Sequence, residues 1–279
     1  MNYSRSSMFG GLPPVVKNII IINVLVLFAE YAFKAAFGIN LIEYFALYYP
    51  DSQNFEPYQY ITHMFMHGGF AHLFFNMFAL FMFGRVLEAV WGSKRFIFYF
   101  FVTGLGAAAL HTFVNFLELN SIQNALKAYA NTPTVDGFMS FINEHFSQYK
   151  ANISQDSTYN RIVDLWSSDP DSSQYARNSV DYINALITQL KNIPTVGASG
   201  AVFGILLAFG MLFPNTQLML LFPPIPIKAK YFVIGYGVLE LYLGFTQQGS
   251  NVAHFAHIGG MLFGFILIKY WNKKGKTFY

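Results

Sequence analysis

Two polar residues stand in otherwise apolar segments of the sequence, and together they have the chemistry of a hydrolase. Ser199 opens one apolar segment, and His257 lies inside another. Polar groups inside a membrane are energetically costly, so each is a functional hypothesis by default. A serine hydroxyl becomes a nucleophile when a neighbouring base takes its proton, and histidine is the side chain that most often does so. The pair therefore predicts a serine hydrolase built inside the bilayer.

Membrane-spanning helices must position these residues. A helix needs about twenty apolar residues to cross the hydrocarbon, and the chain has five such segments and a sixth that is somewhat shorter. The expected spans are residues 16–37, 70–90, 96–116, 198–213, 231–245 and 252–270. The first segment is long and has no small-residue cleavage site after it, so we expect a retained helix and no cleaved signal peptide.

The composition supports a membrane protein. Only 11% of the 279 residues are charged, whereas soluble domains have about 25%. The net charge of +3 gives no reason to expect a nucleic-acid partner. The chain has no cysteine, which excludes disulfides and cysteine-ligated metal.

The distribution of lysine and arginine predicts the orientation of the spans. Cytoplasmic loops carry an excess of these residues. One set of span ends holds Arg5, Lys17, Arg85, Lys94, Arg95, Lys228, Lys230, Lys269, Lys273, Lys274 and Lys276. The opposite short ends hold little beyond Lys34. We therefore expect six spans with both termini in the cytoplasm.

The segment 117–193 differs from the rest because it is polar, and the topology places it outside the cytoplasm. Apolar residues recur at helical spacing in three sets: Ile122, Ala125, Leu126 and Tyr129; Phe138, Phe141, Ile142 and His145; Val180, Ile183, Ile187 and Leu190. Turn residues interrupt the pattern at 132–133 and 168–171. We expect a small helical insertion at 117–193 between two halves of a membrane core, 1–116 and 194–279.

Four polar residues fall at one depth when the spans are laid out at about 1.5 Å per residue. Ser199 lies in the first turn of its span and His257 about two turns into the sixth, and both spans enter from the extracytoplasmic side. His72 and Asn76 lie in the first two turns of the second span and share one helix face. The topology was inferred from Lys and Arg alone, so this agreement is independent of it.

Small residues predict how the two catalytic candidates meet. Gly200 and Gly204 form one small-xxx-small pattern, and Gly260 and Gly264 form another. Such faces let transmembrane backbones approach closely, which would bring Ser199 and His257 within hydrogen-bond reach.

The remaining roles follow from the chemistry. His72, Asn76 and the Ser199 N–H at its helix N-terminus are donors placed to stabilise an oxyanion. We find no Asp or Glu in the spans at this depth to orient His257. The sequence thus predicts a Ser-His dyad and no triad.

These residues resemble the motifs of the rhomboid intramembrane serine proteases. The matching pieces are His67-Gly68-Gly69-Phe70-Ala71-His72 running to Asn76, Gly84, Glu88 and Gly92, Gly197-Ala198-Ser199-Gly200 with Gly204, and Ala256-His257 with Gly260 and Gly264. Glu56-Pro57-Tyr58-Gln59 resembles the family segment before the second span, with Tyr58 in place of a Trp. The match covers most of the chain outside 117–193, on which the resemblance is silent.

The resemblance implies an all-α, six-helix fold with a water-filled cavity opening outward. It implies Ser199 as nucleophile, His257 as base, and His72 and Asn76 in the oxyanion site. The substrates would be single-span membrane proteins, cut in or near the bilayer where small and helix-weakening residues let the strand unwind. No cofactor is implied. We expect the chain in a bacterial cytoplasmic membrane, with segment 117–193 either guiding substrates, contacting a partner, or serving neither purpose.

Three alternatives stay open. The first is a catalytically inactive relative that binds membrane proteins, although such relatives usually lose the Ser or the His. The second is a transporter, although no repeated halves are apparent. The third is a zinc site formed from His63, His67, His72, His254 and His257. We expect no metal, because no helical i, i+4 histidine pair comes with a carboxylate at that depth. We expect His63 and His67 to bond loop backbone and His254 to be structural.

Overall fold

A computed structural model describes residues 11–219, 224–246 and 253–273 of the chain. Four residues used above lie outside these ranges. They are Arg5, Lys274 and Lys276, which contributed to the charge bias, and Val252, the expected first residue of the sixth span.

The described residues form a helical bundle, which confirms the all-α prediction. The bundle helices are α1 (Pro14–Phe37), α4 (Phe70–Ala79), α5 (Arg85–Trp91), α6 (Ser93–Tyr129), α11 (Ser199–Leu212), α12 (Ala229–Thr246) and α13 (His254–Lys273). A π-helical turn, η2 (Leu80–Gly84), joins α4 to α5, so the two helices form one continuous rod. Each predicted span coincides with one of these helical segments.

Among the described residues, three helical segments are long and apolar enough to cross a membrane: Pro14–Phe37, Phe70–Trp91 and Ser93–Tyr129. Helix α11 is apolar but shorter, with 14 residues. It is also the most enclosed helix, since most of its side chains are buried. Pro214 follows its last turn. That α11, α12 and α13 cross the membrane stays a prediction.

Helices α6, α11 and α13 pack against one another to form the centre of the bundle. A Cβ atom at Gly260 of α13 would lie 1.8 Å from the carbonyl oxygen of Gly200 in α11. A Cβ at Gly204 would meet Thr103 at 2.7 Å, and one at Gly264 would meet the Tyr99 hydroxyl at 2.3 Å, both on α6. Glycine at these positions therefore allows the close approach of backbones that the sequence predicted.

The segment between α1 and α4 is held by one buried side chain. It contains α2 (Ile42–Phe45), α3 (Gln59–Thr62) and a 3₁₀ turn, η1 (His63–Phe65). Gln59 is fully buried; its Oε1 accepts from the Tyr48 N–H at 3.3 Å, and its Nε2 donates to the Asn54 carbonyl at 2.8 Å. The Gln59 side-chain amide thus bonds the backbone at two places in this segment, and these bonds hold the segment in place before α4.

Residues 117–193 continue α6 and then fold into α7 (Val135–His145), η3 (Ser147–Tyr149), α8 (Lys150–Ile153), α9 (Ser157–Ser168) and α10 (Ser173–Lys191). Their buried apolar residues form a core of their own, separate from that of the bundle. The predicted turn at 132–133 falls between α6 and α7, and the one at 168–171 starts at the last residue of α9 and ends before α10. Helix α9 was missed, although Ile162 and Trp166 are four residues apart and buried on one face.

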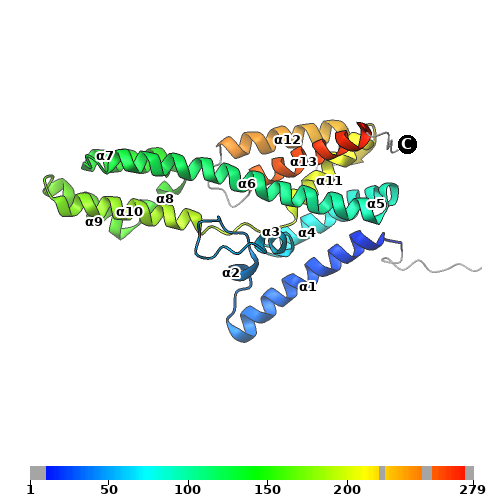
Figure 1. The fold of residues 1–279 in the computed structure, drawn as a ribbon, viewed down its shortest axis with the longest axis horizontal. Helices are drawn as coiled ribbons and strands as arrows, with labels where there is room; N and C mark the ends of the chain where they lie inside the picture. Colours follow the sequence, from blue (N-terminus) through cyan, green and yellow to red (C-terminus); the bar gives the residue numbers. More distant parts are fainter. Residues whose placement is uncertain (1–10, 220–223, 247–252, 274–279) are drawn as a thin grey trace, which may run out of the picture.

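The two cores lie at different places along α6. In Figure 1, α7 to α10 gather at one end of the long α6, whereas the first turn of α1 and the last turn of α13 lie at the opposite end. A two-stranded antiparallel hairpin, β1 (Gln217–Met219) and β2 (Pro226–Lys228), connects α11 to α12. Residue 117 lies within the unbroken helix α6, so the bundle and the extension share this helix.

Candidate active site

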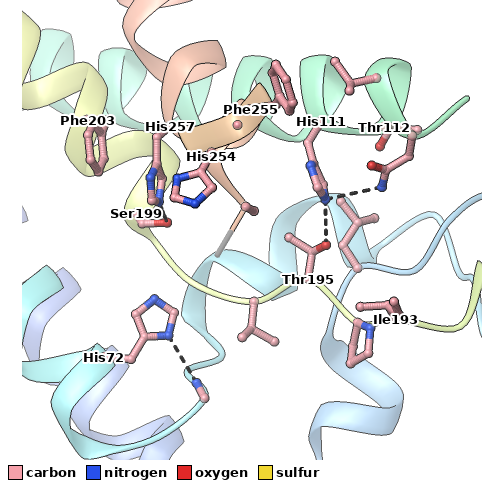
Figure 2. A pocket seen from close by; sticks show the side chains of 18 of the residues that line it. His72, His111, Thr112, Ile193, Thr195, Ser199, Phe203, His254, Phe255 and His257 are labelled. Atoms are coloured by element: carbon pink, nitrogen blue, oxygen red, sulfur yellow. Dashed lines mark hydrogen bonds between the residues drawn. The ribbon is translucent and has the colours of Figure 1, made fainter. Parts of the chain in front are cut away.

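Ser199 and His257 are within hydrogen-bond distance of each other. Ser199 is the first residue of α11, and His257 lies in the first turn of α13. The Ser199 hydroxyl Oγ is 2.9 Å from the His257 Nε2, and Figure 2 shows the two side chains facing each other. Gly260 lies one turn after His257 in α13, and Gly200 directly follows Ser199 in α11. The close contact between these two glycines brings Ser199 and His257 together.

A third residue, Glu240 of α12, completes the chain of hydrogen bonds. The His257 Nδ1 is 2.8 Å from the Glu240 Oε2, and the His254 Nδ1 is 2.7 Å from the same oxygen. Glu240 is only 4% exposed. The expectation that no Asp or Glu lies at the depth of His257 is therefore wrong. Glu240 lies about as far from the outer end of the expected fifth span, residue 245, as His257 lies from the outer end of the sixth, residue 252. The depth count used for the other residues therefore also applies to Glu240, whereas the rotation of α12 that turns it toward α13 cannot be derived from its position along the chain.

Phe203 packs against one face of the His257 imidazole. The two rings stack with centroids 4.1 Å apart and an interplanar angle of 7°. Phe203 follows Ser199 by four residues on α11, so it lies on the same helix face. Phe203 was not among the predicted site residues, although this i, i+4 spacing from a candidate nucleophile is a usable signal.

His72 and Asn76 line the same cavity as Ser199 and His257. His72 Nδ1 accepts from the Gly68 N–H at 3.3 Å. A Cβ at Gly197, whose φ is +117°, would lie 2.9 Å from the His72 Nε2. The imidazole thus packs against the backbone two residues before Ser199, at a position where an L side chain would be both strained and crowded.

The Asn76 side chain has one hydrogen bond within its own helix. Its Nδ2 donates to the His72 carbonyl at 3.0 Å. An amide NH₂ has two hydrogens, so this bond leaves one for another acceptor. Asn76 is buried, with 6% of its surface exposed, and it borders the cavity.

Three further histidines near the site bond neighbouring groups. His63 Nδ1 donates to the Gln59 carbonyl at 2.8 Å, and His67 Nδ1 contacts the Phe65 carbonyl at 3.4 Å. Both bond backbone, as expected. His111 Nε2 is 3.1 Å from the Thr195 hydroxyl, and Figure 2 shows this pair apart from Ser199.

A cavity of about 1710 Å³ joins the site to the extension. Its lining includes Ser199, His257 and Asn76 in the bundle, and Glu144 and Tyr149 in the extension. The extension therefore borders the same space as the candidate catalytic residues.

The three residues Glu240, His254 and His257 also meet the geometric requirement for a metal site. Their ligand atoms all lie within 4.8 Å of one another. Zinc takes nitrogen and oxygen ligands at about 2.0–2.1 Å. The distances of 2.7 and 2.8 Å between the imidazole nitrogens and the carboxylate oxygen are those of N–H···O hydrogen bonds. The arrangement is thus that of a carboxylate accepting two imidazole protons.

The Rhomboid domain model matches residues 54–121 and 176–273. This is more than half of the chain, and it includes all four candidate catalytic and oxyanion residues. The chain belongs to the rhomboid family. It is therefore an integral membrane protein with a rhomboid helical bundle. The rhomboid match omits residues 122–175, which form α7 to α9 and the adjoining turns of α6 and α10.

A curated rhomboid relative is also similar. Rhomboid protease AarA of Providencia stuartii is 26% identical over 121 residues, which are 42% of this chain and 43% of that protein. The aligned part is thus less than half the length of the relative.

Proposed function

We propose that this rhomboid is an intramembrane serine endopeptidase that cleaves the transmembrane segments of membrane proteins. The observation that carries the proposal is the 2.9 Å separation of the Ser199 Oγ and the His257 Nε2 inside a cavity of about 1710 Å³. A hydroxyl in contact with an imidazole is the arrangement that activates a serine nucleophile.

The proposed reaction begins with attack of the Ser199 Oγ on a substrate carbonyl carbon, while the hydroxyl proton moves to the His257 Nε2. The carbon–nitrogen bond of the tetrahedral intermediate then breaks, and the same proton passes from Nε2 to the leaving amine. Water hydrolyses the resulting ester by the same steps, with His257 again accepting a proton.

In the intermediate, the former carbonyl oxygen carries a negative charge. We assign its stabilisation to His72, Asn76 and the Ser199 N–H. Ser199 begins α11, where the first N–H groups have no partner within the helix and the helix dipole favours negative charge. Asn76 contributes the amide hydrogen that His72 does not use. The residues themselves supply every group in this scheme, so it requires no cofactor.

We propose six spans in a bacterial cytoplasmic membrane, with both termini in the cytoplasm and the cavity opening to the other side. The lysine and arginine bias supports this orientation. The start of α1 and the end of α13 lying at one end of the molecule also supports it (Figure 1).

We further propose that residues 117–193 are an extracytoplasmic domain that contacts substrates before cleavage. Glu144, Ser147, Gln148 and Tyr149 of this domain line the cavity that reaches Ser199. Replacing residues 121–189 with a short Gly-Ser linker, and comparing cleavage of several single-span substrates, would test this. Substrate-dependent losses are expected, whereas equal rates on all substrates would contradict the proposal.

Labelling in detergent with a fluorophosphonate probe, on wild type and Ser199→Ala side by side, tests the catalytic assignment. We expect labelling of the wild type alone. No labelling of folded wild type would favour a non-catalytic binder, and labelling of both would mean that another residue reacts. A transport activity that survives Ser199→Ala would favour a transporter.

A further inference from the structure

A buried carboxylate in the fifth expected span contacts the candidate base, His257, on the nitrogen that does not face Ser199. Glu240, in α12, is 4% exposed, and His254 and His257 are 6% and 8% exposed. An ionisable group in a membrane helix is costly unless it is paired. Here the Glu240 Oε2 has two partners, the Nδ1 atoms of both histidines.

These bonds fix which nitrogen of His257 has the proton. A carboxylate oxygen accepts hydrogen bonds, so the nitrogen that faces it, Nδ1, must be the N–H donor. Neutral imidazole has one N–H, and the Nε2 of His257 is therefore the unprotonated nitrogen. That nitrogen faces the Ser199 Oγ, as a general base requires.

His254 restrains the carboxylate from a second direction. It donates its Nδ1 proton to Glu240, while its Nε2 is buried and has no hydrogen-bond partner among the described residues. A protonated Nε2 there would be an unsatisfied buried donor, which is costly. The Nδ1–H tautomer of His254 avoids that cost and leaves the Glu240 carboxylate as the acceptor of both imidazole protons.

The charge becomes important during the reaction. When Ser199 loses its proton, His257 becomes an imidazolium whose Nδ1–H still points at the Glu240 carboxylate. A fixed negative charge at hydrogen-bond distance stabilises this cation without any rearrangement. A neutral side chain at position 240 could make the same contacts between α12 and α13, but it would not stabilise the His257 imidazolium.

Building on the proposed function, we propose that Glu240 completes a Ser199–His257–Glu240 triad, and that His254 is a positioning residue for Glu240. Glu240 holds the tautomer and orientation of His257 and stabilises its protonated form, in the role that an aspartate has in soluble serine proteases. The predicted dyad is thus extended by a residue from a third helix.

The test compares Glu240→Gln with wild type and with Glu30→Gln. Glu30 is a matched control because it is a buried glutamate in α1, 8% exposed and away from the cavity lining. For each folded variant, the rate of fluorophosphonate labelling is measured over a range of probe concentrations, which separates the maximal inactivation rate from the concentration at half saturation. We expect Glu240→Gln to lower the maximal rate about 10²- to 10⁴-fold with half saturation unchanged, and Glu30→Gln to behave as wild type.

Two further measurements keep the proposal testable if Glu240→Gln does not fold. His254→Phe removes one hydrogen bond to the carboxylate and should lower the maximal rate about fivefold. In wild type labelled with ¹⁵N-histidine, the nitrogen chemical shifts at alkaline pH should show His257 as the Nδ1–H tautomer.

The failures can be told apart. Wild-type labelling by folded Glu240→Gln, or an Nε2–H tautomer of His257 in wild type, would overturn the triad and leave the proposed protease standing. If folded wild type is not labelled at all, the proposed protease function itself is overturned.

Discussion

The contact between Gly260 and Gly200 allows the site to be disturbed without altering any of its polar side chains. In Gly260→Ala, the new Cβ would lie 1.8 Å from the Gly200 carbonyl oxygen and 2.7 Å from its carbon. Contacts below 3.0 Å do not occur for real Cβ atoms, and the neighbours here are backbone. Helix α13 must therefore move away from α11 by about 1.2 Å or more.

That movement acts on the catalytic pair, because His257 lies one turn before Gly260 and Ser199 directly precedes Gly200. The distance between the Ser199 Oγ and the His257 Nε2, now 2.9 Å, would grow to about 4 Å, beyond hydrogen-bond range. A misplacement of about 1 Å costs on the order of a hundredfold in rate. We therefore expect fluorophosphonate labelling of Gly260→Ala to be about a hundredfold slower.

The matched control is Gly235→Ala in α12, where a Cβ would meet nothing within 4 Å. It should be labelled at the wild-type rate. Thermal unfolding and size-exclusion chromatography would establish that both variants are folded. If folded Gly260→Ala were labelled as fast as Gly235→Ala, the proposed dependence of the catalytic distance on this glycine contact would be refuted.

Three more predictions concern single residues. Asn76→Ala should lower the maximal labelling rate about tenfold to a thousandfold, as loss of one oxyanion donor does; an unchanged rate would remove Asn76 from the oxyanion site. Phe203→Leu removes the ring stacked on His257 and should lower the rate about two- to tenfold, since an aromatic pair contributes about 0.5–1.5 kcal/mol, and an equal rate would show that stacking does not orient the base. Asp156 caps α9, and the Thr158 N–H, followed by the Tyr182 hydroxyl, holds the pKa of the Asp156 carboxyl below its ordinary value of 3.8. Because this pKa is lowered on folding, the stabilisation is present above about pH 5 and is lost as the pH falls through the folded value. Asp156→Ala should therefore cost about 1 kcal/mol at neutral pH, seen as faster amide hydrogen exchange over Ser157–Ser168, and Asp156→Asn, which keeps an acceptor, should cost less. Equal exchange in Asp156→Ala and wild type at pH 7 would exclude the cap.

The sequence predicts the site where spacing along one helix decides the geometry. Ser199 and Gly200, or His257 and Gly260, are close in the chain, so their relation to a small-residue helix face can be derived from helical periodicity alone. Helices α7 and α10 and the end of α6 were predicted for the same reason, from apolar residues three and four apart, whereas α9 was missed.

Glu240 and Phe203 show where this reasoning fails. Glu240 reaches His257 only because of how α12 is rotated against α13, and an apolar span with an almost uniform surface gives no periodic signal for that rotation. Phe203 resembles the many other phenylalanines in the spans, and its role depends on a ring angle of 7°. The rotation of α12 and the angle between the two rings both depend on the packed bundle, although the i, i+4 spacing of Phe203 from Ser199 is visible in the sequence.

The continuity of α6 has a consequence for the placement of the extension. This single helix of 37 residues, about 55 Å long, packs on α11 and α13 through Thr103 and Tyr99 and then supplies Leu119, Ile122 and Leu126 to the core of the extension. An α-helix turns about 100° per residue. Deleting one residue between these two regions would therefore turn the end of α6, and the helices α7 to α10 that follow it, by about 100° around the α6 axis. The number of residues in the middle of α6 thus sets the direction in which the extension leaves the bundle. Deletions there of one, two and four residues would change this direction and oppose the second attachment of the extension, where Lys191 pairs with Asp51 and Thr195 with Leu47.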